Sequence, residues 1–341
     1  MTKLKLKTHF KAYYTDWRFW YKVFFAVWSS CMVLYSILYG WIHIDETMLQ
    51  TKDAAGKVAS EKPLYGVYDE TGTLIGYNYW EYFIYTFTFF TCQSNILVMI
   101  WFITAAIFHT KEGEMGILKA NFSIAVAVYI TMTCLIAMVY MLPLALIVAS
   151  ISDGASAAAN PMGGTGVVDQ ANGGMAIFMQ LSLHLFIPIG TVIYVTLFLR
   201  KAKIMTTKQY MQQMWWRIAM YPICYSVMVL ISGSLLNAAG APYILQYPYF
   251  FFYVWQNGQP QPTGISRWPL DGIPIPGYAW TIISLIIMFS IVLGFSVCYN
   301  YASIMQKLDK EKRSAYKKMD YTKKAELIYE LNHHQKEESL A

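Results

Sequence analysis

Long runs of apolar residues alternate with short polar segments along most of the chain. No Asp, Glu, Lys or Arg occurs in the 49 positions between Arg217 and Arg267, or in the 33 positions between Lys119 and Asp153. Helices of soluble domains rarely exceed about 20 residues, whereas crossing a bilayer requires apolar runs of about that length. The pattern therefore predicts a polytopic helical membrane protein.

Six of these runs are long enough to span a membrane. Their predicted ranges are about 23–42, 82–108, 120–142, 175–199, 215–236 and 279–301. Together they form a membrane domain (23–303), preceded by a basic segment (1–22) and followed by a charged tail (304–341). Pro143 closes or kinks the third run. The fold class that we expect is all-α, a bundle of six transmembrane helices.

The composition narrows the functional classes. Hydrophobic residues make up 56% of the chain and charged residues 13%, against about 25% charged residues in soluble domains. Too few charges remain to coat a water-facing surface, which excludes ordinary water-soluble enzymes and nucleic-acid-binding modules. The five cysteines lie within apolar runs and form no CxxC pair, so we expect neither disulfides nor a metal site.

The distribution of Lys and Arg predicts the orientation. With the amino terminus in the cytoplasm, the cytoplasmic side carries 22 of these residues and the opposite side carries 4. Cytoplasmic segments of membrane proteins carry such an excess, so we expect a multi-pass protein of the cell membrane with both termini cytoplasmic. The net charge of +6 is then a topology signal rather than a sign of a nucleic-acid partner, and the basic tail reads as a solvated or lipid-surface helix.

Three loops face outward in this topology. The polar loop 44–79 is expected to contain a small hairpin around Asp69–Gly72, and the Gly-rich loop 152–174 reads as a flexible linker. The third loop begins with the aromatic run 242–255, which is too short to span and is typical of an interfacial or re-entrant segment.

Ionisable residues inside a bilayer are costly, so each is a candidate for function. Among them, His184 is the one that falls well inside a predicted span, apart from Arg217 near a cytoplasmic end. No carboxylate lies inside a predicted span, which disfavours proton-driven or ion-driven transport.

The second predicted span carries a polar stripe. In a continuous helix, Thr88, Thr91 and Asn95 share one face, which Ser94 borders. Thr91 and His184 each lie about ten residues below the outer end of their span, or roughly 15 Å down at 1.5 Å per residue, near the bilayer middle. Two groups at matching depth can meet where their helices pack.

Acyl transfer is a reaction that such a pair supports. A threonine hydroxyl needs a neighbouring base to take its proton, and neutral imidazole does so near pH 7. Asn95, Gln93 or Ser94 would then orient the base or donate to an oxyanion. The structural alternative is that Thr and Ser bond the carbonyl one helical turn back, as they commonly do in membrane helices. His184 as a haem ligand lacks a second intramembrane histidine.

Several short motifs carry a family likeness. Residues 89–97 read FFTCQSNIL, residues 184–188 read HLFIP, residues 221–225 read YPICY, and residues 247–250 read YPYF. In this order they resemble the androgen-induced membrane hydrolase family and its bacterial six-span relatives, over roughly residues 20–305. The resemblance implies intramembrane hydrolysis of lipid esters, notably fatty acid esters of hydroxy fatty acids, with Thr91 as nucleophile and His184 as its partner. The Ser94–Asn95 pair resembles the bacterial members.

The leading hypothesis is therefore a membrane hydrolase of lipid acyl esters, with membrane lipids as substrate and no cofactor, metal or nucleic acid. Thr91 attacks the ester carbonyl, and His184 acts first as base and then as acid. The expected supporting residues are Gln93, Ser94, Asn95, Tyr225, Tyr247 and Tyr249. Two alternatives use the same chain differently: a lipid or small-molecule transporter or binding protein without catalysis, and an accessory subunit that binds a partner protein through its outward loops or basic tail.

Overall fold

The computed structural model describes residues 14–46, 48–52, 58–141, 173–199, 204–241, 243–255 and 276–340. Most of the basic segment (1–22), Pro143 and almost all of the predicted linker 152–174 lie outside these ranges.

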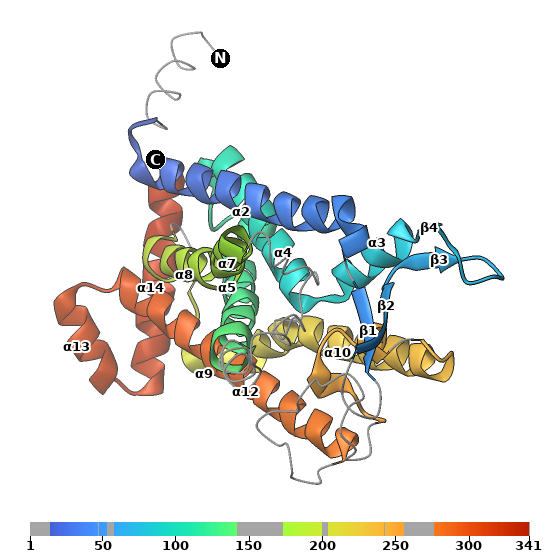
Figure 1. The fold of residues 1–341 in the computed structure, drawn as a ribbon. Coiled ribbons are helices and arrows are strands. Elements are labelled where there is room, and N and C mark those ends of the chain that lie inside the picture. Colours follow the sequence, from blue (N-terminus) through green and yellow to red (C-terminus); the bar gives the residue numbers. More distant parts are fainter. Residues whose placement is uncertain are drawn as a thin grey trace.

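The described residues contain six helices that are long and apolar enough to cross a membrane, so the predicted all-α membrane bundle is confirmed (Figure 1). Five of them are centred on α2 (Trp17–Ile42), α4 (Phe90–Ile107), α5 (Ala120–Leu135), α10 (Trp215–Ala238) and α12 (Gly277–Lys307). The remaining span combines the helices α7 (Gly173–Leu181) and α8 (Ile187–Ile193) with the π-helical turns η6 (Ser182–Phe186) and η7 (Tyr194–Phe198). A further π-helical segment, η4 (Ile136–Met141), extends α5.

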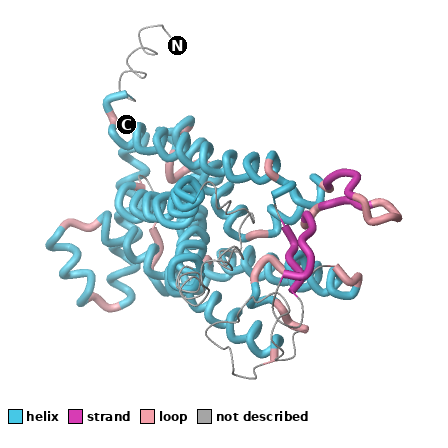
Figure 2. Tube along the Cα trace, in the orientation of Figure 1, coloured by secondary structure: helices cyan, strands magenta, loops and turns pink. Residues whose placement is uncertain are grey.

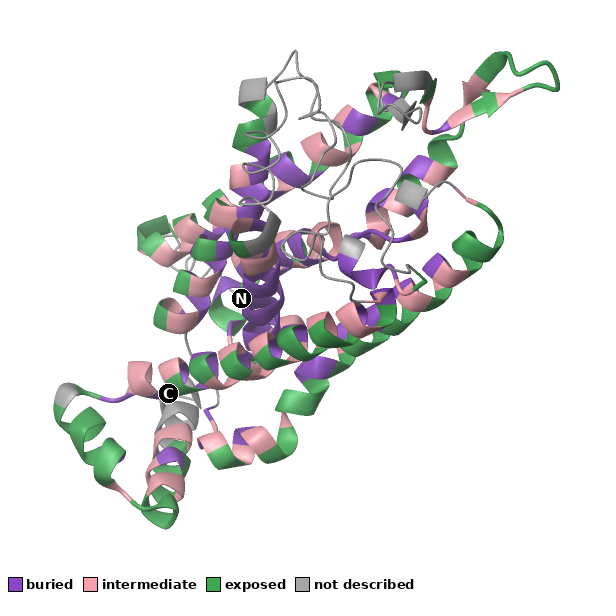
Figure 3. Ribbon diagram, turned by 60° about the horizontal axis from the view of Figure 1, so that its bottom comes forward, coloured by how far each residue is buried: buried purple, intermediate pink, exposed green. Residues whose placement is uncertain are grey.

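Helix α5 forms the centre of the bundle, where it packs against α4, α8 and α12. About two thirds of the residues in the most apolar stretch of this span are buried, against 22% for α12 and 28% for α2. Figure 3 shows the buried residues gathered in the interior and the exposed ones on the outer helices. Large aliphatic side chains such as Ile286 of α12 and Val27 of α2 are more than half exposed. These faces are suited to contact lipid tails.

Helix α2 begins earlier than the sequence predicted. It starts at Trp17 rather than near residue 23, with the Asp16 carboxylate accepting a hydrogen bond from the Arg18 amide as an N-cap. Lys22 therefore lies inside the helix and is fully buried. The sequence placed His184 and Arg217 alone within the predicted spans. That prediction was wrong, because Lys22 is another ionisable side chain within a membrane helix.

The second predicted span is broken. Residues 82–108 form no single helix: α3 (Tyr79–Thr88) ends, Phe89 is extended with φ −74° and ψ 125°, and α4 begins at Phe90. Thr88 consequently does not share a helical face with Thr91 and Asn95, which corrects the predicted polar stripe.

Short strands lie at one end of the molecule (Figure 2). Strand β1 (Met48–Lys52) pairs with β2 (Val58–Pro63), and β3 (Gly66–Tyr68) pairs with β4 (Leu74–Tyr77), both antiparallel. The second pair is the predicted hairpin, which is confirmed. The Asp69 carboxylate accepts from the amides of Thr71 and Thr73, and hydrogen bonds from Thr71 and this turn lower the pKa of that carboxyl.

The aromatic run after α10 folds into the bundle. It contains α11 (Tyr243–Gln246) and the turn η8 (Phe250–Phe252), and Tyr247, Tyr249 and Phe252 are buried. A methyl group at Gly233 of α10 would lie 2.1 Å from the Tyr247 ring, so this glycine permits the close approach. The contacts favour the re-entrant alternative over a purely interfacial one.

Three helices lie outside the six spans, near the cluster formed around Ile204: α9 (Thr207–Gln213), α13 (Lys310–Lys318) and α14 (Tyr321–Leu340). Ile204, Ile304 and Ile328 share a small apolar cluster there. The Asn332 side chain accepts from the Ile204 amide at 3.1 Å and donates to the Ile204 carbonyl at 3.0 Å. The charged tail is therefore fastened to the membrane domain.

Candidate functional site

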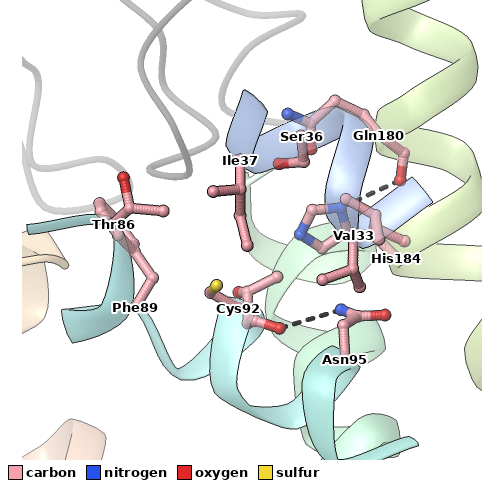
Figure 4. A pocket seen from close by; sticks show the side chains of 11 residues that line it. Val33, Ser36, Ile37, Thr86, Phe89, Cys92, Asn95, Gln180 and His184 are labelled. Atoms are coloured by element: carbon pink, nitrogen blue, oxygen red, sulfur yellow. Dashed lines mark hydrogen bonds between the residues drawn. The ribbon is translucent and has the colours of Figure 1, made fainter. Parts of the chain in front are cut away.

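A small cavity of about 30 Å³ lies between α2, the first turn of α4 and η6 (Figure 4). Its polar lining includes Thr86, Thr91, Cys92, Asn95, Gln180 and His184. Val33, Ile37 and Leu183 form part of its apolar wall. Thr91 and His184, which the sequence placed at similar depth in two different spans, thus both line one pocket.

His184 is held in one tautomer. Its side chain is 4% exposed, and Nδ1 lies 3.0 Å from the Gln180 carbonyl oxygen one helical turn earlier. A carbonyl only accepts, so Nδ1 carries the hydrogen and Nε2 keeps a lone pair. Figure 4 shows Nδ1 on the Gln180 side of the ring and the other nitrogen turned the opposite way. The imidazole is therefore arranged to accept a proton. The π-helical turn that carries it is a feature frequent at functional sites.

Two tyrosines of α10 support the helix break beside the pocket. The Tyr225 hydroxyl donates to the Thr88 carbonyl at 2.8 Å and accepts from the Phe90 amide at 3.2 Å. Gln93 adds a hydrogen bond from its Nε2 to the Phe87 carbonyl at 2.7 Å, while its Oε1 accepts from the Tyr221 hydroxyl. These bonds satisfy backbone groups that a break would leave exposed in an apolar environment.

Tyr249 holds Thr91. Its hydroxyl accepts from the Thr91 amide at 3.2 Å and lies 3.0 Å from Thr91 Oγ1. When Tyr249 donates to Oγ1, the hydrogen of the Thr91 hydroxyl is left free for a group in the pocket. No direct hydrogen bond joins the side chains of Thr91 and His184, both of which the structure describes. Thr91 is bonded to Tyr249, and His184 is bonded to Gln180.

The polar groups around the pocket are incompletely paired. Asn95 Nδ2 donates to the Thr91 carbonyl at 2.9 Å, which identifies Oδ1 as its acceptor oxygen. Asn95 Oδ1 and Gln180 Oε1 are buried and have no hydrogen-bond partner in the described part of the chain. Buried polar atoms in native proteins are normally paired, so these two oxygens beside a cavity are candidates for contact with a ligand or water.

The other predicted supporting residues lie around the pocket rather than in its lining. Ser94 Oγ lies 2.7 Å from Thr133 Oγ1 and joins α4 to α5. The Tyr247 hydroxyl lies 3.2 Å from Ser234 Oγ. Gln93 and Tyr225 serve the helix break, and Tyr249 reaches Thr91.

Sequence reasoning missed Gln180 and Cys92, which also line the pocket. Gln180 is four residues before His184, so helical spacing was the available signal for it; Cys92, next to Thr91, had no such signal. No cluster of three or more His, Cys, Asp or Glu suited to a metal ion occurs among the residues that the structure describes.

In comparison with known proteins, no family model, no curated protein and no solved structure matches the chain.

Proposed function

We propose that this protein is an intramembrane hydrolase that cleaves acyl esters of membrane lipids. The observation that carries the proposal is that Thr91 of α4 and His184 of η6 line one small cavity inside the helical bundle. The imidazole tautomer that accepts at Nε2 and the Tyr249 contact to Thr91 Oγ1 support the proposal, which further requires the two side chains to come within hydrogen-bond reach when substrate binds.

The proposed reaction has two stages. Thr91 Oγ1 attacks the ester carbonyl carbon while its hydrogen passes to His184 Nε2; the bond from carbon to the alcohol oxygen then breaks, and His184 returns the proton to the departing alcohol. Water, deprotonated by His184, next attacks the threonyl ester. The bond from the acyl carbon to Oγ1 breaks, the fatty acid leaves, and His184 returns the proton to Thr91 Oγ1. Tyr249, which is already bonded to Oγ1, positions the nucleophile.

The decisive experiment uses the purified full chain in lipid nanodiscs. Turnover of a fluorogenic acyl ester and labelling by a fluorophosphonate probe are measured for Thr91→Ala and His184→Ala. Both variants are expected to lose at least about a hundredfold in turnover, the lower end of the effect of one general base. Thr104→Ala is the matched control, because the Thr104 hydroxyl bonds the Ile100 carbonyl on the same helix, away from the pocket. Turnover that survives in both pocket variants would refute the proposal.

A second candidate is binding or transport of a lipid without catalysis. It is favoured by the absence of a direct bond between the described Thr91 and His184 side chains, since each is held by another residue. Flux or binding in vesicles without any released fatty acid would favour this alternative.

The proposed orientation places both termini in the cytoplasm, in the cell membrane. The unequal distribution of Lys and Arg, 22 to 4, supports it. A fluorescent protein fused after residue 341 should fold and fluoresce, whereas a secreted phosphatase inserted in the loop 44–79 should be active. The opposite pattern of signals would reverse the orientation.

A further inference from the structure

Two buried acceptors in the lining of the pocket have no donor among the described residues. His184 Nε2 is not one of them, because the proposed reaction uses it to take the Thr91 proton. Asn95 Oδ1 and Gln180 Oε1 are acceptors without a partner in the described residues, and their side chains are 1% and 9% exposed. Both residues line the same cavity, Asn95 from α4 and Gln180 from α7.

We infer that the pocket recognises a lipid that carries a free, neutral hydroxyl group close to its ester. This inference rests on the proposed function, because it names the substrate class of the same site. Ester carbonyls, ethers and phosphate oxygens only accept hydrogen bonds, so they leave these two acceptors unsatisfied. A hydroxyl group supplies the missing donor.

The charge of the lining excludes an ammonium group as the donor. Among the described residues that line the cavity there is no Asp or Glu to pair with a cation, and an unpaired charge at this depth is costly. A neutral O–H group needs no such partner.

The dimensions of the cavity agree with a hydroxyl-bearing head rather than an acyl chain. About 30 Å³ holds one or two water-sized groups, which is the scale of a hydroxyl with the carbon that bears it. The acyl chain would instead follow the apolar wall at Val33 and Ile37 towards the lipid-facing side of α2.

The test measures binding without chemistry. The probe is 1-O-hexadecylglycerol, whose ether bond cannot be hydrolysed and whose two hydroxyls are free. The comparison compound is its dimethyl ether, which has the same chain but no O–H group. Cys92, which lines the pocket, reports occupancy through its rate of alkylation by N-ethylmaleimide. The other cysteines are replaced by Ala so that Cys92 alone is labelled: Cys31, Cys134, Cys224 and Cys298.

The free diol is expected to slow alkylation of Cys92 at least fivefold more than the dimethyl ether at equal concentration. Gln180→Met, which keeps the side-chain length and removes the acceptor, should reduce this preference towards unity, as should Asn95→Leu. If both compounds protect Cys92 equally, water serves the acceptors and the inference is overturned. If neither compound protects, it is overturned as well. Because Gln180→Met is close in shape to the native residue, it tests the idea even if Asn95→Leu does not fold.

The same assay separates this inference from the proposed function. Diol-selective protection in a protein that hydrolyses no acyl ester would support hydroxyl recognition and refute the hydrolase. Hydrolysis of acyl esters with no preference between a free and a methylated hydroxyl would support the hydrolase and refute hydroxyl recognition.

Discussion

Two buried polar clusters in this bundle differ in how completely their atoms are paired. In the first, Glu112 Oε2 accepts from Lys22 Nζ at 2.5 Å and from the Tyr194 hydroxyl at 2.7 Å, and Lys22 is fully buried. In the second, the pocket at Thr91 and His184, the groups are neutral and several have no partner among the described residues. In the charged cluster the side chains bond one another. In the pocket, Asn95 and Gln180 each carry an oxygen without a described partner, and a cavity lies beside them.

The difference suggests a division of roles. The Lys22–Glu112–Tyr194 cluster joins α2, the connection between α4 and α5, and η7, three segments far apart in the chain. Its groups satisfy one another, as a structural contact requires. The pocket instead keeps two buried acceptors, on Asn95 and Gln180, that have no donor among the described residues. Substitutions should therefore change stability at the first cluster and ligand handling at the second.

The largest expected effect comes from Glu112→Ala. The substitution leaves the Lys22 charge buried without a partner, which costs about 3–5 kcal/mol of stability. Thermal unfolding followed by fluorescence-detected size exclusion should show a large fall in the transition temperature, or loss of the folded peak. Glu114→Ala, at an exposed position on the same connection, is the control and should change little. The double variant Lys22→Met/Glu112→Leu should recover most of the loss. Equal stability of Glu112→Ala and the native chain would remove the contrast between the two clusters.

Gly233→Ala should act at the pocket through the backbone. The added methyl group would lie 2.1 Å from the Tyr247 ring, so the segment that carries Tyr249 must shift, at a cost of about 1–3 kcal/mol. Because Tyr249 holds Thr91, ester turnover should also fall. Gly294→Ala of α12 is matched, since nothing lies within 4 Å of its new methyl group. A Gly233→Ala protein as stable and active as the Gly294→Ala protein would contradict the packing described here.

Gln180→Met should have the opposite sign to Glu112→Ala. It removes a buried oxygen that has no partner among the described residues, so stability should be unchanged or rise by up to about 1 kcal/mol. The transition temperature, measured without ligand, provides the check. A marked fall would mean that the Gln180 amide is structural, and the two clusters would no longer differ in kind.

The smallest effect concerns pH at the edge of the charged cluster. Burial lowers the pKa of His109, and the nearby Lys22 charge lowers it further, although Asp16 lies 3.2 Å away and opposes both. Folding then favours the neutral ring. The stability that His109 contributes in this way is complete above pH 6.5, the ordinary pKa of histidine, and is lost as pH falls below that value. The transition temperature of the native protein should fall more between pH 7.5 and 5.5 than that of His109→Gln. Parallel pH profiles would show that His109 makes no such contribution.

The membrane fold was predictable because long uncharged runs have few other physical explanations. The candidate His184 was found for a related reason, since an ionisable residue within such a run is rare. The break at Phe89 was not predictable from its neighbours. It depends on hydroxyls of Tyr225 and Tyr249, which lie 135 and 158 residues from the backbone amides that they bond. The burial of Lys22 likewise depends on Glu112, 90 residues away. Both features come from long-range pairing, which local hydrophobic patterns do not encode.

The break has an electrostatic consequence. An α-helix carries roughly half a positive elementary charge at its amino terminus, and the effect is confined to about the first turn. A continuous helix over 82–108 would place that charge near the membrane surface, where water screens it. Because α4 begins at Phe90, its positive end lies beside Thr91 in the apolar interior instead. In the proposed reaction, negative charge that develops on an ester oxygen beside Thr91 would be stabilised there by the helix dipole, without any charged side chain at that point.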